Sequence, residues 1–148
     1  MNEAKDKYQT IDEIESIIKS FNNCTLPRNQ WDHHAHLTVA LWYLIHYQKP
    51  EVIYLIRESI QKYNQSMNII TTNNSGYHET MTLFWIDLVS QYLKNNHAEN
   101  CLLTLTNQLI HEYGDKNLVF DYYSKNLIMS CEALQNWVNP DLQPIMKD

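Results

Sequence analysis

The sequence predicts an all-α protein: a single-domain bundle of four to five helices with an irregular C-terminal strap. The chain has 148 residues, 44% of them hydrophobic, which is the size of one domain with a continuous core. Two glycines and four prolines are too few for a sandwich or barrel, which need turn residues every ~8–12 positions. There is no internal repeat and no linker, so residues 1–148 are expected to form one helical domain.

Apolar residues recur at helical spacing along five stretches of the chain. Thr10 and Glu13 have the spacing of a capping box at the start of the first stretch. Pro50 suits the first turn of the third, and Gly114 is placed to end the fifth. The helices are expected at about 11–22, 33–47, 50–66, 78–94 and 99–113.

The remaining segments are predicted to be loops, short helices and chain ends. Residues 1–9 are expected to be a flexible N-terminus, and the polar residues 68–76 to form a loop. The pattern over 118–129 is ambiguous between helix and loop. Ser130 is placed to cap a short helix through Trp137, after which an extended tail begins at about residue 140.

Composition argues against several classes of function. A formal charge of −6, with Arg28 and Arg57 as the two arginines, offers little with which to neutralise phosphates, so nucleic acid is not an expected partner. No apolar run approaches the ~20 residues that span a bilayer, and the N-terminus lacks the apolar core of a signal peptide. We therefore expect no membrane partner and a cytoplasmic location, and the abundance of Asn, Ile and Lys suggests a bacterial source.

Histidines are concentrated in two short segments, 31–37 and 76–80. On a helical wheel, His33 falls in the middle of the apolar arc of its helix and His36 at the edge of that arc. His78 falls in the centre of the apolar stripe of the fourth helix, with Glu79 at its edge. His33, His36 and His78 are therefore expected to face inward, whereas His34 falls on the flank and is left out of the site.

Inward histidines need partners, because a buried imidazole without a hydrogen bond costs a few kcal/mol. A His-x-x-His pair with a third histidine and a glutamate is a ligand set that suits a divalent Zn, Fe or Mn ion. The sequence thus predicts a metal site at His33, His36 and Glu79, with His78 as a fourth ligand or a neighbour. Glu79 would be a ligand or the catalytic general base of a metal-dependent enzyme acting on a small polar substrate.

Two other interpretations stay open. The same His and Glu side chains can serve a metal-free enzyme as general acid and base. They can also belong to a non-catalytic binding or interaction module, in which the histidines satisfy one another in the core. The sequence does not fix the oligomeric state.

Arg57 and Tyr123 are further candidates for substrate binding. Arg57 lies beside the apolar stripe of the third helix, where it can clamp a carboxylate of a substrate or of Glu79. A structural salt bridge to an acid such as Asp87 or Asp141 is the favoured alternative, because arginine is common in partly buried ion pairs. Tyr123 can supply a phenol to the same pocket.

Several of these residues occur together in a recognisable order. The pattern runs through Trp31-x-His33-x-Ala35-His36-Leu37, Leu55-x-Arg57, Tyr63-Asn64, Gly76-Tyr77-His78-Glu79-Thr80-x-Thr82, Tyr123-Ser124, Ser130 and Trp137-Val138-x-Pro140-Asp141-Leu142-x-Pro144. It resembles an uncharacterised family of small helical bacterial proteins with W-x-H-x-A-H-L and G-Y-H-E-T motifs.

The resemblance covers roughly residues 26–145 and implies a real site without naming its reaction. The chain departs from the family pattern at Asp32, where a threonine is usual, and at Leu134, where a basic residue is frequent. If that basic residue contacts an anionic ligand in the relatives, the second departure implies that the contact has been lost or relocated here. Asp32 is well placed to cap a helix.

Overall fold

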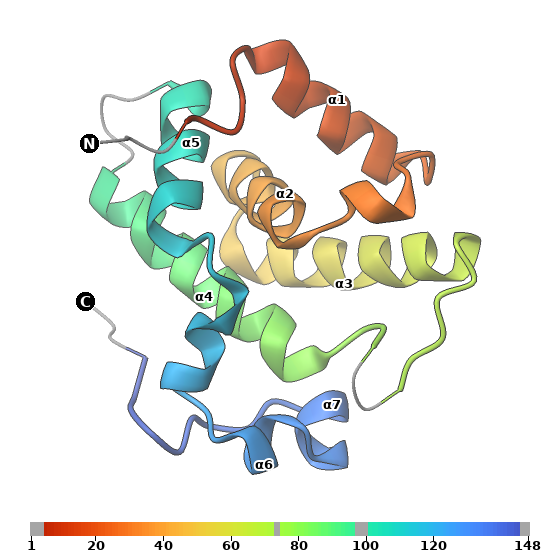
Figure 1. Ribbon diagram of the computed structural model, residues 1–148, viewed down its shortest axis with the longest axis vertical. Coiled ribbons are helices and arrows are strands. Elements are labelled where there is room, and N and C mark those ends of the chain that lie inside the picture. Colours follow the sequence, from red (N-terminus) through yellow and green to blue (C-terminus); the bar gives the residue numbers. More distant parts are fainter. Residues whose placement is uncertain (1–4, 73–74, 97–100, 146–148) are drawn as a thin grey trace.

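The computed structural model describes residues 5–72, 75–96 and 101–145, and it confirms the predicted all-α fold (Figure 1). Within these ranges the only extended pairing is an isolated bridge between Thr72 and Ser75. The main helices are α1 (Ile11–Asn22), α2 (His33–His46), α3 (Lys49–Ser66), α4 (Glu79–Asn96) and α5 (Leu102–Tyr113). Shorter turns are η1 (Arg28–Gln30), η2 (Lys116–Asp121), α6 (Lys125–Ile128) and α7 (Cys131–Gln135).

The helix boundaries agree with the helical spacing of the sequence to within a few residues. The predicted start of the fifth helix at residue 99 lies outside the described residues. The ambiguous stretch 118–129 resolves into most of η2 and α6. The short helix after Ser130 is present but ends at Gln135, before Trp137.

The helix starts owe their positions to capping side chains. Thr10 and Glu13 form the predicted capping box on α1. A carboxylate oxygen of Asp32 accepts a hydrogen bond from the backbone N–H of Ala35 at 2.9 Å, which confirms the capping role of Asp32. Ser130 accepts a hydrogen bond from the N–H of Ala133 at 3.1 Å.

Helix α2 is the centre of the bundle, with α1, α3, α4 and α5 packed around it (Figure 1). Its buried residues occur around most of its circumference, and they include Leu37, Val39 and Leu41. Tyr8, within the segment expected to be flexible, is buried; its phenol lies 3.0 Å from the hydroxyl of Thr38 on α2. Tyr8 thus anchors the segment just before α1 to the central helix.

A second, smaller core joins the C-terminal part of the chain to α4. It consists of buried Phe84 and Leu88 from α4 with Val119, Tyr123 and Ile128. Residues 136–145 form an irregular strap, as predicted, and the N–H of Leu142 donates to the carbonyl of Tyr122 at 2.9 Å. No helix in the described ranges combines the length and apolar character needed to cross a membrane.

Candidate functional site

His78 immediately precedes α4 and uses both ring nitrogens in hydrogen bonds. Nδ1 accepts from the backbone N–H of Met81 at 3.1 Å, which caps the helix, and this leaves Nε2 as the protonated nitrogen. Nε2 donates to the carbonyl of Ile128, the last residue of α6, at 2.8 Å. The pKa of His78 is lowered because burial disfavours the charged ring, so the neutral tautomer that this geometry needs is favoured.

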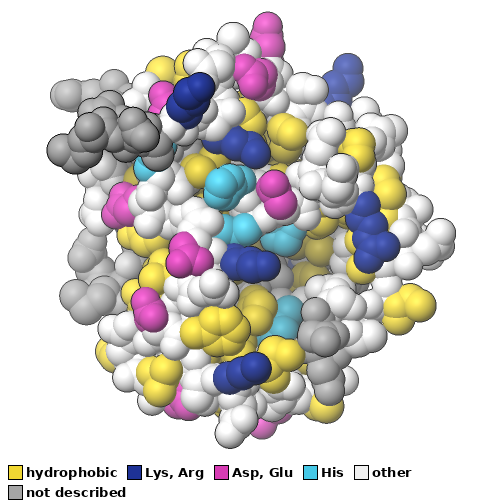
Figure 2. All heavy atoms as spheres, in the orientation of Figure 1, with side chains coloured by type: hydrophobic (Ala, Val, Ile, Leu, Met, Phe, Trp, Pro, Cys, Tyr) yellow, Lys and Arg dark blue, Asp and Glu magenta, His cyan; other side chains and the backbone are white. Residues whose placement is uncertain are grey.

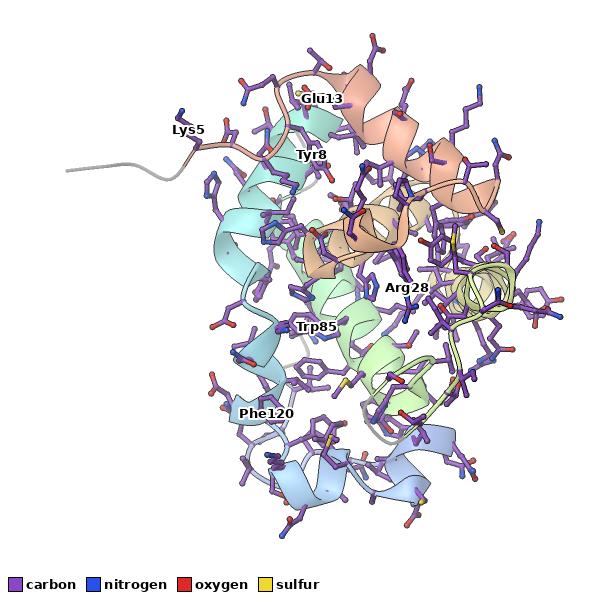
Figure 3. All side chains as sticks on the ribbon, turned by 45° about the vertical axis from the view of Figure 1, so that its right-hand side comes forward. Lys5, Tyr8, Glu13, Arg28, Trp85 and Phe120 are labelled. Carbon is purple, nitrogen blue, oxygen red and sulfur yellow. The ribbon has the colours of Figure 1, made fainter. Side chains whose placement is uncertain are left out.

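His33, at the start of α2, is half-buried and has a similar partner. Its Nε2 lies 3.0 Å from the carbonyl of Tyr113, the last residue of α5. The ring packs edge-on against Trp85, with centroids 4.5 Å apart. Figure 3 places Trp85 on α4, beside the passage from α5 into the C-terminal segment. Burial lowers the pKa of His33, which likewise favours the neutral ring.

His36 does not face the core, which corrects the expectation from the helical wheel. Its side chain is exposed, and its ring packs against the indole of Trp31 with centroids 4.0 Å apart. Surrounding protein still desolvates the ring, and together with the nearby His33 this lowers the pKa of His36 to about 4. Figure 2 shows histidine side chains visible near the middle of one face of the molecule.

The four side chains predicted to bind a metal do not form one ligand set in the described part of the chain. No group of three or more His, Cys, Asp or Glu side chains there is placed to hold a metal ion. His33 and His78 instead bind the carbonyls at the ends of two other helices. The carboxylate of Glu79 accepts hydrogen bonds from Arg57 and Tyr77 instead.

Glu79 is the centre of a network with Arg57 and Tyr77. Arg57 of α3 donates through Nε and Nη2 to the two carboxylate oxygens, at 3.1 and 2.6 Å. The phenol of Tyr77 donates to Oε1 of the same carboxylate at 2.5 Å. This bidentate pair raises the pKa of Arg57, and burial followed by the Glu79 contact raises the pKa of Tyr77 to about 12.

Arg57 therefore forms a salt bridge with Glu79, one of the pairings considered from the sequence, and not with the suggested partners Asp87 or Asp141. Asp87 pairs with Lys49, and Asp141 accepts a hydrogen bond from the N–H of Ser124 at 2.7 Å. Tyr123 lies wholly in the second core and donates to the carbonyl of Val138 at 2.7 Å. Since its hydroxyl is occupied there, Tyr123 is part of the core rather than of a substrate pocket.

Arg57, Tyr77 and Glu79 line an open hollow of about 670 Å³ between α3, the segment before α4, and α7. The rest of the lining is mostly polar and contains four side-chain amides. The other lining residues are Gln61, Asn64, Gln65, Ile69, Thr71, Leu134 and Gln135. Leu134 of α7 thus lies in the wall of this hollow.

The G-Y-H-E-T motif fixes this wall to its surroundings. Gly76 has a φ of 85° and packs so closely on Thr71 that a Cβ would lie 2.6 Å from its Cα. Thr80 is buried, and its hydroxyl donates to the carbonyl of Asn136, just after α7, at 2.7 Å. Gly76 and Thr80 therefore fix the two ends of the segment that carries Tyr77 and Glu79, which line the hollow.

Sequence reasoning did not single out Tyr77 or Asn64 as candidate site residues. Asn64 carries a usable signal, because it follows Ile56 and Ile60 at intervals of four residues on the inward stripe of α3. A polar residue on such a stripe is an informative exception. Tyr77 carries no comparable signal, because it precedes its helix and has no wheel position.

Comparison with known proteins adds no identification. No protein-family model, no curated protein and no solved structure matches this chain.

Proposed function

We propose that this protein binds a small, uncharged polar molecule in the hollow beside the Arg57–Glu79 pair. The observation that carries the proposal is the three-residue network of Arg57, Glu79 and Tyr77 in the wall of that hollow. Side chains held by each other are pre-organised, so a ligand does not have to order them on binding. A pre-organised wall of this kind favours ligands whose shape fits it without rearrangement.

The charge of the lining supports an uncharged ligand. The guanidinium of Arg57 is neutralised by the carboxylate of Glu79, with two hydrogen bonds between them. The other polar lining groups are amides and hydroxyls. An anion would have to compete with Glu79 for Arg57, whereas a neutral molecule leaves the pair intact.

The proposal keeps the small polar substrate and the Arg57 and Glu79 positions expected from the sequence. Glu79 acts in it as a positioning residue, because its carboxylate already accepts three hydrogen bonds. The metal-dependent reaction stays a prediction that would require Glu79 or His78 to leave these partners. A non-catalytic binding protein is consistent with the same wall.

The test is a screen of neutral polar fragments by amide NMR on wild type and two tryptophan variants. Gln135→Trp places an indole in the wall of the hollow, and Gln135 is exposed, so the fold should tolerate the change. Asn136→Trp makes the same kind of change at the next residue, which is exposed and outside the lining. We expect fragments to shift resonances of Gln61, Gln65 and Gln135 in wild type.

The expected outcome is that Gln135→Trp weakens these fragments at least tenfold and Asn136→Trp leaves them unchanged. Failure of every fragment to shift these resonances, or equal weakening by both variants, would contradict the proposal.

A further inference from the structure

Asn64 differs from the other amides around the hollow because its residue is largely buried, whereas Gln61, Gln65 and Gln135 are exposed. Its side chain belongs to a residue that is 8% exposed, and it lines the hollow from α3. Its backbone carbonyl accepts a hydrogen bond from the N–H of Ile69 at 2.8 Å. The side-chain amide has no hydrogen bond to any group in the described part of the chain.

The amide of Asn64 still reaches solvent, because Thr106 Oγ1 is the one fully buried side-chain polar atom without a partner among the described residues. Polar side chains in largely buried residues are nearly always hydrogen-bonded, so water is the partner left to this amide in the unliganded protein. The neighbours on the stripe, Ile56 and Tyr63, are buried and apolar or satisfied, so nothing on α3 itself explains an asparagine there. Because Asn64 lines the hollow, a ligand bound there can replace the water that hydrogen-bonds to its amide.

The chemistry of the Asn64 amide defines which ligand groups can form hydrogen bonds with it. A side-chain amide presents one carbonyl acceptor beside an N–H donor, and it pairs best with the same arrangement reversed. Molecules with a carboxamide, a ureide or a nucleobase edge have an N–H beside a C=O and match it with two hydrogen bonds. A carboxylate presents acceptors alone and can use the donor side only.

We infer that Asn64 is a specificity-determining residue that recognises an amide-type edge, a donor beside an acceptor, on the molecule bound in the hollow. The inference rests on the proposed function and narrows its ligand class. Gln61 and Gln65 on the same helix and Gln135 on α7 line the outer part of the site with further donors and acceptors. Arg57 and Glu79 keep that part electrically neutral.

The experiment compares benzamide with benzoate. Both have the same phenyl ring, but benzamide presents a donor beside an acceptor, whereas benzoate presents two acceptors. Uracil provides the same edge on a nucleobase. Dissociation constants are measured by NMR titration on wild type, Asn64→Leu and Gln65→Leu. Asn64→Leu removes the amide and keeps the number and branching of the side-chain heavy atoms, and Gln65→Leu removes the amide of the adjacent, exposed residue of the lining.

We expect benzamide to bind wild type at least tenfold more tightly than benzoate, and Asn64→Leu to remove that preference. Gln65→Leu should change benzamide binding less than threefold. Uracil binding with the same dependence on Asn64 would assign the edge to a nucleobase, and its failure beside benzamide binding would assign it to a carboxamide. Circular dichroism of both variants verifies that they are folded.

The inference is overturned if benzoate binds as well as benzamide, or if Asn64→Leu keeps the preference while folded. In both cases fragments still occupy the hollow, and the proposed function survives. If no neutral fragment from the screen shifts resonances of the hollow, the proposed function fails as well, so the two failures are distinguishable.

Discussion

The starts of α2 and α4 carry similar histidine-bearing segments but use them differently. At α2, Asp32 caps the helix, His33 binds the last carbonyl of α5, and His36 lies exposed against Trp31. At α4, His78 is itself the cap and also binds the last carbonyl of α6. The first segment joins one pair of helices, whereas the second joins its helix to the C-terminal core and to the hollow.

The comparison shows that a histidine at an inward helix position can find its hydrogen-bond partner in a backbone carbonyl at the end of a neighbouring helix. The last carbonyls of a helix have no partner within it, and they are acceptors for a ring N–H from a neighbouring helix. His33 and His78 both meet this need, at Tyr113 and Ile128. Because His78 makes the hydrogen bonds that cap α4 and join it to α6, the next residue, Glu79, can pair with Arg57.

The largest expected effect comes from His78, because it makes two hydrogen bonds. His78→Ala should lower the free energy of unfolding by about 2 kcal/mol, the sum of a lost cap and a lost hydrogen bond between helices. His78→Asn keeps a capping side chain and should recover about half of that loss. Urea unfolding followed by circular dichroism measures both; an Asn variant no better than Ala would show that capping is not the role.

His33→Ala should have a smaller effect, about 1–1.5 kcal/mol, because it removes one hydrogen bond and a ring contact with Trp85 while Asp32 still caps α2. The loss should be concentrated at the end of α5. Amide hydrogen exchange can detect it as faster exchange in the last turn of α5 than in α1. Uniformly faster exchange in all helices would argue against a local role.

The Arg57–Glu79 pair should contribute about 1 kcal/mol, because the side chain of Arg57 is 35% exposed and solvent weakens the pair. A double-mutant cycle with Arg57→Gln and Glu79→Gln isolates this coupling. Tyr77→Phe, added to Glu79→Gln, should cost little more, because its partner is already altered. A coupling near zero would mean that the network does not hold the wall of the hollow.

His36 should matter least at neutral pH, with His36→Gln changing the free energy of unfolding by about 0.5 kcal/mol or less, as expected for an exposed residue. Its effect lies in the pH dependence. The unfolded chain binds a proton at His36 below about pH 6.5, whereas the folded protein does so near pH 4.

Between these values the unfolded state therefore holds more protons, and stability falls as the pH drops through this interval. Urea unfolding at pH 7.5, 5.5 and 4 should show a shallower decline for His36→Gln than for wild type. An identical decline in both proteins would contradict the lowered pKa of His36.

Much of the fold could be predicted from the sequence, because helical spacing and capping residues are local signals. Thr10, Asp32 and Ser130 each mark a helix start through a bond to backbone only three residues away. The helical wheel placed His36 at the edge of the apolar arc of α2, but its side chain is exposed. A wheel carries no information on which neighbouring segments cover the first turn of a helix, so it could not show this exposure.

The site was less predictable, because it depends on which helices meet. Arg57 and Glu79 were both candidates, and their pairing was one of the stated alternatives. The choice among Glu79, Asp87 and Asp141 is made by the packing of α3 against α4, which no local pattern encodes. The carbonyl partners of His33 and His78 belong to helix ends distant in sequence, so a metal was the simpler expectation.

The most direct test of the central claim is the protonation and tautomer state of His78, read from long-range ¹H–¹⁵N spectra of the imidazole ring at pH 7. The hydrogen bonds to Met81 and Ile128 require a neutral ring with its proton on Nε2, and this signal should be unchanged by equimolar Zn²⁺. A proton on Nδ1, or a ¹⁵N shift of either nitrogen on adding Zn²⁺, would contradict the account and return His78 to the predicted metal site.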